Sequence, residues 1–467
     1  MASLLFLYLP AAASANGGVK SYPRHSVSGQ SAGGSAAVQH LVAFSSLVDG
    51  AAVAAGSPYG CGSLARPDYT CMYGTGMSIR NANQYLEQRA AEGKIDDPKN
   101  LKRTPVILFS GSSDSMVYTK VMLEVQKQLQ SYVDEDKLHT NFDTTAGHVW
   151  SIDHGACVCG VCPYGGLGNF QCCQANNCEY DLSGEFMRAT YGMHVKPRAT
   201  ASPKLYWINQ WDYWTAGPPK LTATVMEWLV AYVPDSCKAA PSQCKLHINY
   251  HGCSKPEWHE RIAWATGLDL NEYAEANDMI VLYPQAQGSR SSGEGCWNWE
   301  AYGDDPDFDT REGKEMSMVM RIAANLTLAV KHALVSTDGQ PPPEVQEAHN
   351  DNQYFYSYGS GVGDAAVGHV NTNERKAHAR PMPPAEQVEA PAPAGTIASF
   401  VAIIGAASGP VAPATGLSTT AVVSMGVVGA AAVGALLVFA VKRRTHRRNA
   451  AETAPAQPYS ALASPVS

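Results

Sequence analysis

The sequence lacks a basic stripe outside its extreme C-terminus. Its 34 lysines and arginines are outnumbered by 42 acidic residues, which gives a formal net charge of -8 and a pI near 6.0. Proteins that bind nucleic acid carry clustered positive charge along one face. We therefore exclude nucleic acid as a partner.

Cysteine is absent before residue 61 and after residue 296, so all twelve cysteines lie between these positions. This density is typical of an oxidising compartment, where disulfides persist. Cys61 with Cys71, and Cys237 with Cys244, are natural bridge candidates because each pair closes a short loop. A further group contains Cys-x-x-Cys spacing, which makes zinc an alternative, although adjacent glycines and a secretory context favour disulfides. That group consists of Cys157, Cys159, Cys162, Cys172, Cys173 and Cys178.

The N-terminus lacks a basic residue ahead of its short apolar run. The alanine-rich stretch that follows ends in Ala13-Ser14-Ala15, and an apolar run before an A-x-A pattern is typical of a secretory signal peptide. We therefore interpret residues 1–15 as a signal peptide. The missing basic region leaves a buried N-terminal strand of the mature fold as the alternative.

A composition suited to a packed core stops near residue 338. Residues 338–418 are rich in proline and alanine, and such a segment cannot bury enough apolar surface to order itself. It is predicted to be a disordered stalk. The globular domain is therefore expected over residues 16–337.

Charge is absent from Thr419 to Val441. A helix of that length crosses the roughly 30 Å of hydrocarbon in a bilayer. The basic tail over residues 442–467 would stay in the cytosol by the positive-inside rule, which places the preceding chain in extracellular or lumenal space. The sequence thus predicts a single-pass type I membrane protein, with a buried core helix as the alternative. Glycines and alanines in the span would permit a helix-mediated dimer.

The globular part alternates short β-branched runs with helical patterns. Residues 105–110 form a strand pattern and residues 118–131 a helical one. This rhythm predicts an α/β fold with a parallel sheet and helices on its faces. Further strands are expected at 51–55, 245–250 and 279–283, and further helices at 35–44, 79–91, 268–277 and 312–334.

A G-x-S-x-G box lies near the start of this domain. It reads Gly29-Gln30-Ser31-Ala32-Gly33, with a short strand before it and a small-residue helix after it. This context is typical of a nucleophile elbow, where side chains at either glycine would collide with neighbouring backbone. A box of this kind is weak evidence alone in a chain with 41 glycines. The strand and helix around it favour Ser31 as a nucleophile.

A serine nucleophile needs a base, and the base needs an orienting carboxylate. Asp114 follows the strand pattern at 105–110, so it is expected on a loop at the carboxyl end of a strand. His148 follows a predicted strand and Gly147 directly, and it completes the order serine, aspartate, histidine. His154 is the rival base. The position of His148 directly after a strand and a glycine favours it over His154.

Several sequence blocks, taken in order, resemble a known family. They are similar to the extracellular polyhydroxybutyrate depolymerases of fungi and bacteria, within the wider esterase group that includes feruloyl and acetylxylan esterases. The resemblance spans nearly all of residues 22–335. Its blocks are residues 28–34, 56–61, 71–73, 111–114, 147–148, 178–181, 251–253, 280–285 and 295–299.

This resemblance implies a serine esterase of the α/β-hydrolase type. Ser31, Asp114 and His148 would be its catalytic triad. The backbone N–H groups of Ala32 and Cys253 would hold the oxyanion that forms during acyl transfer. That mechanism requires no metal and no cofactor, and an ester would be the substrate.

The resemblance also implies how the rest of the site is built. A disulfide between Cys253 and Cys296 would hold the oxyanion loop rigid. Trp297 and Trp299 flank the same corner, and their rings would bind an apolar acyl unit. Core packing is the alternative for both tryptophans.

The order of the blocks differs from that of most α/β-hydrolases. Those proteins usually place the His-Gly oxyanion strand before the nucleophile, whereas here residues 251–253 follow the whole triad. The resemblance therefore implies a circularly permuted hydrolase with a mostly parallel sheet and helices on both faces. Such a permutation is physically tolerated when the termini of a domain lie close together.

Other features depart from the family. The cysteine-rich insert over residues 155–178 is larger, and a stalk and membrane span stand where a polymer-adsorbing domain would follow. Feruloyl-type or acetylxylan-type cell-wall esters and soluble oligomers are therefore alternatives to a polyester. A non-catalytic cell-surface binding protein on a hydrolase fold is the alternative of a different class. Asn325-Leu326-Thr327 fits an N-glycosylation acceptor, which is consistent with an outside location.

Overall fold

The structure is a computed structural model that describes residues 22–346, except 66, 161–173, 254–256, 288–294 and 301–304. The expected signal peptide, membrane span and cytoplasmic tail lie outside the described residues, as does most of the expected stalk. Among the residues that are described, no helix is both long enough and apolar enough to cross a membrane.

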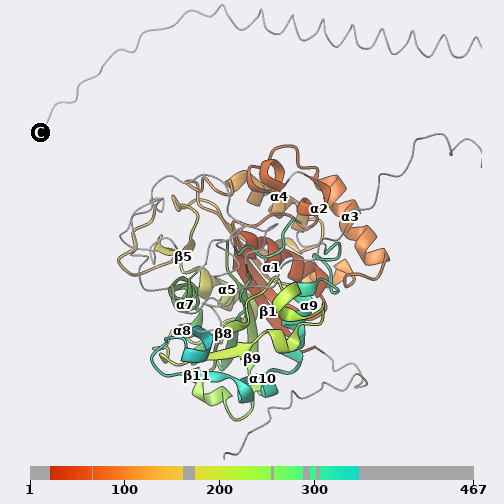
Figure 1. Ribbon diagram of the computed structural model, residues 1–467. Coiled ribbons are helices and arrows are strands. Elements are labelled where there is room, and N and C mark those ends of the chain that lie inside the picture. Colours follow the sequence, from red (N-terminus) through yellow and green to blue (C-terminus); the bar gives the residue numbers. More distant parts are fainter. Residues whose placement is uncertain are drawn as a thin grey trace, which may run out of the picture. The chain divides into compact units, whose positions relative to one another are not determined.

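A nine-stranded sheet forms the centre of the described fold (Figure 1). Its strand order is β11-β7-β8-β10-β9-β1-β2-β3-β4, and the run from β10 to β4 is parallel. β8, β7 and β11 extend it through antiparallel pairs, and β5 and β6 form a separate small parallel sheet. The strands are β1 His25–Gln30, β2 Val48–Ala54, β3 Val106–Phe109, β4 Leu138–Asn141, β5 Trp150–Ile152, β6 Ala175–Asn177, β7 Leu205–Asn209, β8 Trp228–Tyr232, β9 Lys245–Tyr250, β10 Met279–Tyr283 and β11 Leu334–Ser336.

Helices cover both faces of this sheet. Apolar residues of α1, α3, α4, α9 and α10 join one buried cluster, and those of α5, α7 and α8 join another. The predicted α/β architecture, with a mostly parallel sheet between helices, is therefore confirmed. The helices are α1 Ala32–Ala43, α2 Cys61–Leu64, α3 Ile79–Ala91, α4 Thr119–Leu129, α5 Leu182–Tyr191, α6 Pro219–Thr222, α7 Trp258–Thr266, α8 Leu270–Ala276, α9 Lys314–Ala324 and α10 Leu326–His332.

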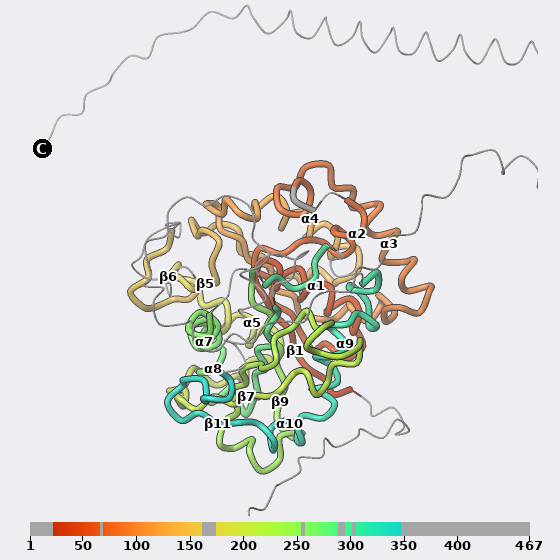
Figure 2. The backbone as a smooth tube through the Cα atoms, in the orientation of Figure 1, coloured from red at the N-terminus to blue at the C-terminus, as the bar shows by residue number. Residues whose placement is uncertain are grey.

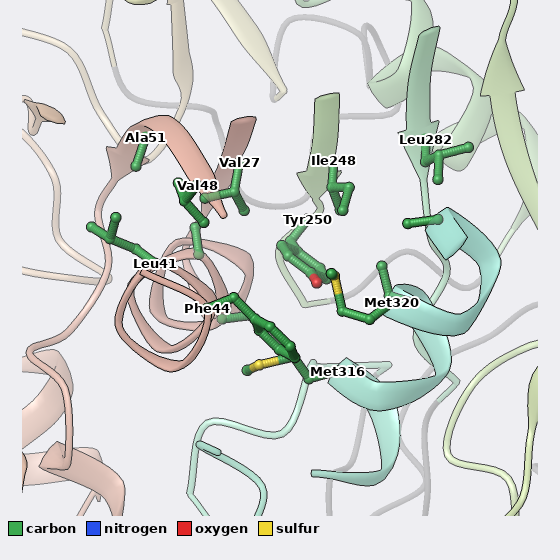
Figure 3. Packing of buried hydrophobic residues seen from close by; sticks show 14 of the residues in the cluster. Val27, Leu41, Phe44, Val48, Ala51, Ile248, Tyr250, Leu282, Met316 and Met320 are labelled. Atoms are coloured by element: carbon green, nitrogen blue, oxygen red, sulfur yellow. The ribbon is translucent and has the colours of Figure 1, made fainter. Parts of the chain in front are cut away.

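Three of the parallel strands, β2, β3 and β10, are apolar on both faces because each face is buried. Along β2, Ala51 and Val53 belong to the first cluster, and Ala52 and Ala54 belong to the second. This alternation follows the two-residue period of a strand. Figure 3 shows the first cluster, in which Phe44, the residue after α1, lies between the sheet and the methionines of α9.

The first strand of the chain lies inside the sheet. β1 pairs with β2 on one side and with β9 on the other, all three parallel, and the tube in Figure 2 follows the red β1 beside the later β9. The carboxyl ends of these strands therefore meet at one edge. The segments after β1 and β9, far apart in sequence, are brought together there.

Most predicted elements occur where expected, but one helix is broken. The pattern over residues 312–334 predicts a single helix, whereas the structure has α9, α10 and then β11. The break falls at Asn325, whose side-chain amide donates to the carbonyl of Arg321. Asparagine competes for backbone hydrogen bonds in this way and interrupts helices.

The fold also extends beyond the expected boundary at residue 337. Val345 is fully buried and belongs to the second core cluster. Its backbone N–H donates to the carbonyl of Pro342. The proline-rich composition therefore begins inside the folded domain, and the expected start of the stalk is corrected to a later residue.

Candidate active site

Ser31 occupies a strained turn between strand and helix. β1 ends at Gln30 and α1 begins at Ala32, and Ser31 between them has φ 60° and ψ -128°. A positive φ costs energy in a residue other than glycine, and such strain is stored at functional sites. Backbone hydrogen bonds hold the turn, because Ser31 N–H donates to the Ala54 carbonyl at 2.9 Å and Ser35 N–H donates to the Ser31 carbonyl at 2.9 Å.

Two glycines make this turn sterically possible. A Cβ atom on Gly29 would lie 2.1 Å from the carbonyl oxygen of Gly33, and one on Gly33 would lie 2.1 Å from that of Tyr250. Both neighbours are backbone atoms and cannot rotate away. The geometry is that of a nucleophile elbow, in which the serine side chain is presented at the end of a central strand.

Asp114 and His148 are brought together by hydrogen bonding. The His148 Nδ1 atom lies 2.8 Å from Asp114 Oδ2. The other carboxylate oxygen of Asp114 accepts the backbone N–H groups of Met116 and Val117, both at 2.9 Å. The Asp114 side chain is 1% exposed and that of His148 is 21% exposed. The carboxylate is therefore buried and fixed, and it holds the imidazole with Nε2 as the ring atom left to accept a proton.

The loops that carry these two residues are joined to each other. Ser112 N–H donates to the Thr144 carbonyl at 2.9 Å, and Ser113 N–H donates to the Ala146 carbonyl at 3.1 Å. A Cβ atom on Gly111 would lie 1.9 Å from that Ala146 oxygen. Gly111 therefore permits the close backbone contact that sets His148 against Asp114.

Backbone hydrogen bonds also link the strand ends that carry Ser31 and Asp114. Ser31 follows β1 and bonds to Ala54 of β2, and the next residue, Ala55, donates to Phe109 of β3 at 3.0 Å. Within the described residues, no hydrogen bond joins the Ser31 hydroxyl to His148. Catalytic hydrogen bonds are often long in ligand-free proteins and shorten when substrate binds.

The rival histidine has a different environment. The His154 ring contacts both carboxylate oxygens of Asp269 at 2.9 and 3.0 Å, and its side chain is 53% exposed. Arg198 donates to the same carboxylate at 2.6 Å and to Asp153 at 2.7 Å. His154 is therefore part of a surface ion-pair network. The guanidinium already binds both carboxylates and would repel a cation, so this cluster is a poor metal site.

A second loop approaches Ser31 from β9. A Cβ atom on Gly252 would lie 3.1 Å from the Ser31 Cβ and 3.7 Å from its hydroxyl oxygen. Ala32 and the two half-cystines Cys253 and Cys296 belong to one apolar cluster beside the elbow. The structure thus brings Ala32 and Cys253, the two predicted oxyanion donors, into the same cluster next to Ser31.

The described disulfides include every predicted pair. Cys61–Cys71, Cys237–Cys244 and Cys253–Cys296 are all bonded. The cysteine-rich insert contributes Cys159–Cys178, and Cys157 is also disulfide-bonded. These bonds argue against the zinc alternative for the described members of the group, whereas Cys162, Cys172 and Cys173 lie outside the described residues.

The two tryptophans occupy different layers. Trp297 is 1% exposed and belongs to the main core, with its ring edge-to-face on Tyr250 at 4.9 Å between centroids. Substrate contact requires an accessible ring, so this placement favours core packing, the alternative for Trp297, over contact with substrate. Trp299, 9% exposed, lies in the cluster beside Ala32. Of the two, Trp299 is the better placed to border the site.

One buried acid near the site has no motif in the sequence. Glu315 at the start of α9 accepts the backbone N–H of Asn298 at 2.9 Å and the hydroxyl of Thr224 at 2.6 Å. Burial raises the pKa of Glu315 to about 7. Its contact fixes the segment that follows Trp297. The sequence gives one signal for Glu315. It precedes Val319 by four residues, so the helical period places this acid on the apolar face of the predicted helix.

No protein-family model matches the chain. The chain is 30% identical over 327 residues to a poly(3-hydroxybutyrate) depolymerase of Delftia acidovorans, covering 68% of this chain and 61% of that protein. It is 31% identical over 305 residues to a polyhydroxybutyrate depolymerase of Talaromyces funiculosus, covering 60% of this chain and 84% of that protein. The chain therefore spans less than two thirds of the Delftia protein.

Two solved structures of PHB depolymerases have a fold similar to that of this chain. A serine-to-alanine variant of a PHB depolymerase, complexed with an R3HB trimer, aligns with a TM-score of 0.57 at 25% identity. A PHB depolymerase from Penicillium funiculosum aligns with a TM-score of 0.56 at 26% identity. Each alignment covers 66% of this chain and 98% of the other. The nine-stranded sheet and its helices are thus similar to the fold of these two hydrolases.

Proposed function

This chain belongs to the polyhydroxybutyrate depolymerase family, and from that premise we propose that it is a serine esterase in which Ser31, His148 and Asp114 carry out acyl transfer. The observation that carries the proposal is the 2.8 Å contact between His148 and the buried Asp114 at the sheet edge where the strained Ser31 turn ends. This pairing leaves His148 Nε2 as a proton acceptor. It supplies the orienting acid and base that a serine nucleophile needs.

The proposed reaction has two steps. The Ser31 hydroxyl oxygen attacks the ester carbonyl while His148 Nε2 takes its proton, and the tetrahedral intermediate expels the alcohol, which receives that proton. Water then attacks the acyl-serine with the same base, and the carboxylic acid and free Ser31 result. The N–H groups of Ala32 and Cys253 would stabilise the negative oxygen in both intermediates.

We propose hydroxyalkanoate esters as the substrate class. Support comes from the names of the relatives and from the R3HB trimer bound in one similar structure. Feruloyl-type and acetylxylan-type esters are the alternative within the same chemistry.

The strand order supports the interpretation of a circularly permuted hydrolase, because the nucleophile strand β1 is the first of the described strands yet lies between β9 and β2.

We also propose an extracellular or lumenal location with a C-terminal membrane anchor. The disulfides of the domain support an oxidising compartment. The uncharged stretch from Thr419 to Val441 and the basic residues after it support the anchor. Protease treatment of intact cells that express the chain with a C-terminal tag tests this arrangement. For an extracellular domain we expect loss of the domain with survival of the tag. For a lumenal domain both survive on intact cells, and protease treatment of isolated vesicles should remove the tag and spare the domain. Loss of the tag on intact cells would contradict the arrangement.

The test of the catalytic proposal is hydrolysis by the purified full chain. A short-chain nitrophenyl ester, a 3-hydroxybutyrate trimer, methyl ferulate and acetylated xylan are compared, with Ser31→Ala as the control. We expect hydrolysis of the nitrophenyl ester and the trimer, and its loss in the variant. Preference for ferulate or xylan would replace hydroxyalkanoate esters with cell-wall esters as the substrate class. Binding of the trimer without turnover would favour a non-catalytic binding protein.

A further inference from the structure

The buried ring of His251 makes two hydrogen bonds to described parts of the backbone. The backbone N–H of Ala286 donates to His251 Nε2 at 3.1 Å. An atom that accepts this bond carries no proton, so the proton of the neutral ring is on Nδ1. Nδ1 lies 2.6 Å from the Gly252 carbonyl oxygen, and it therefore donates to that oxygen. The two contacts together select one tautomer and one ring orientation.

The bond to Gly252 also orients the next residue's N–H. The Gly252 carbonyl and the Cys253 N–H belong to one peptide unit, which is planar and, in the absence of any cis peptide bond among the described residues, trans. The two groups point in opposite directions. A donor that holds the carbonyl on the His251 side therefore turns the Cys253 N–H away from His251. Gly252 itself lies against Ser31.

We propose that His251 is the positioning residue of the oxyanion hole, which sets the Gly252–Cys253 peptide plane so that its N–H faces the reacting carbonyl. The proposal rests on the proposed esterase function. A peptide turned the other way would remove a donor and place a carbonyl oxygen near the developing negative charge. Loss of one such donor lowers turnover by roughly a hundredfold to a thousandfold.

The surroundings of His251 keep its ring in place. The Trp297 ring packs on it with centroids 5.6 Å apart, which gives this buried tryptophan a role behind the loop. Arg261 donates to the Ala286 carbonyl at 3.2 Å and to the Gln285 side chain at 2.8 Å. These bonds fix the segment whose N–H selects the His251 tautomer.

A pair of substitutions separates positioning from simple packing. In His251→Asn the amide nitrogen replaces Nδ1 and can still donate to the Gly252 carbonyl. In His251→Gln the amide oxygen can replace Nε2 as the acceptor for Ala286, but the donor to Gly252 is lost. We expect kcat on a nitrophenyl ester to fall by about a hundredfold or more in His251→Gln, with KM changed less than about threefold, and to be largely retained in His251→Asn.

The control and the contrary outcomes are distinct. His154→Gln replaces an exposed imidazole and should keep wild-type kcat. Wild-type kcat in His251→Gln, or equal losses in both His251 variants that follow their melting temperatures, would overturn the positioning role while leaving the esterase proposal intact. Absence of hydrolysis by the wild-type chain would overturn the esterase proposal and this inference with it.

A measurement on the unmodified protein covers the case in which the variants do not fold. Long-range ¹H–¹⁵N correlation spectra of histidine-labelled protein distinguish the two neutral tautomers. The His251 signal, identified by its contact with the Trp297 ring and so distinguished from the other buried rings of His25, His40 and His247, should report a proton on Nδ1. A proton on Nε2 of His251 would contradict the inference.

Discussion

The two proposed oxyanion donors are held in different ways. Ala32 is the first residue of α1, and its N–H is placed by the turn at Ser31, which backbone hydrogen bonds to Ala54 and Ser35 maintain. Cys253 lies on a loop after β9, and its position depends on side chains: the disulfide to Cys296 and the hydrogen bond from His251 to Gly252.

The elbow at Ser31 is therefore a local structure, whereas the oxyanion loop at Cys253 is assembled from distant segments. The elbow is built from residues close in sequence, whose glycines avoid collisions that no side-chain rotation could relieve. The oxyanion loop is built from segments that meet only in the folded sheet. Changes to the elbow should therefore lower activity in step with folding, whereas changes to the loop should lower the kcat of protein that is still folded.

The largest effect on activity is expected for Asp114→Asn, because this substitution should leave both the elbow and the oxyanion loop in place. In Asp114→Asn, Oδ1 still accepts the N–H groups of Met116 and Val117, so the loop should keep its shape. The amide would now donate toward His148 Nδ1 and force the wrong tautomer. We expect kcat to fall on the order of 10⁴-fold with an unchanged melting temperature, measured by ester hydrolysis and thermal unfolding.

The control for this variant is Asp153→Asn, in the surface network around Arg198. It should hydrolyse the ester at the wild-type rate. An Asp114→Asn protein with more than a tenth of wild-type kcat would show that the Asp114–His148 contact is structural.

The elbow itself is tested by Gly33→Ala. The added methyl group would meet the Tyr250 carbonyl oxygen at 2.1 Å, so β1, α1 and β9 would have to move apart. We expect destabilisation of several kcal/mol, with activity lost in parallel. Denaturant unfolding of Gly33→Ala is compared with that of Gly76→Ala, where φ is +83° and nothing lies within 4 Å. Gly76→Ala should cost only about 1 kcal/mol. Equal losses of unfolding free energy in Gly33→Ala and Gly76→Ala would contradict the steric explanation.

The elbow could be predicted from the sequence, and the loop only in part. Gly29, Ser31 and Gly33 are adjacent in the chain, so the strand, turn and helix follow from local rules. The bounds of β9 and β10 are also as predicted, and β10 is the continuous apolar run expected of a central parallel strand. The Cys253–Cys296 pair came only from the family resemblance.

Other features depend on contacts that no local pattern encodes. The burial of Trp297 follows from its packing on Tyr250 and His251, which are far away in sequence. Composition placed the end of the domain before residue 338, whereas Val345 is in the core. A single apolar residue in a proline-rich stretch, such as Val345, does not indicate burial until the cluster that it joins is known.

The assembled loop is tested by removal of its disulfide. We expect the Cys253→Ser, Cys296→Ser double variant to lose between about tenfold and a hundredfold in kcat, because the Cys253 N–H is loosened rather than removed. Its stability should fall by about 2–4 kcal/mol. The Cys237→Ser, Cys244→Ser double variant is the matched control, and it should lose stability without losing kcat. A loss of kcat in the control, or none in the Cys253 variant, would contradict the comparison.

The smallest effect concerns the buried imidazoles that join the two regions below the site. The His25 ring contacts that of His40 at 2.8 Å, and His40 contacts the Tyr250 hydroxyl of β9 at 2.8 Å. His247 of β9 contacts Ser28 of β1 at 2.8 Å. Burial lowers the pKa of His25 to about 4 and that of His247 to about 3, and burial also lowers the pKa of His40 well below its usual value.

These shifts predict loss of stability on acidification. Below pH 6.5 the unfolded chain binds protons that the three folded imidazoles do not, so each of them lowers the stability of the folded state as the pH falls toward 5. Burial raises the pKa of Glu315 to about 7 and that of Asp309 to about 6. These two acids favour the folded state as pH falls and offset part of the loss. Thermal unfolding should show a lower melting temperature at pH 5 than at pH 7.5, and an equal or higher one would contradict the prediction.

The most direct test of the site is the structure of the protein after reaction with a fluorophosphonate. We expect one adduct, on the Ser31 hydroxyl oxygen, with the phosphonyl oxygen within hydrogen-bond distance of the backbone nitrogens of both Ala32 and Cys253. This expectation would be contradicted by an adduct on another residue, or by a Ser31 adduct whose phosphonyl oxygen points away from both nitrogens.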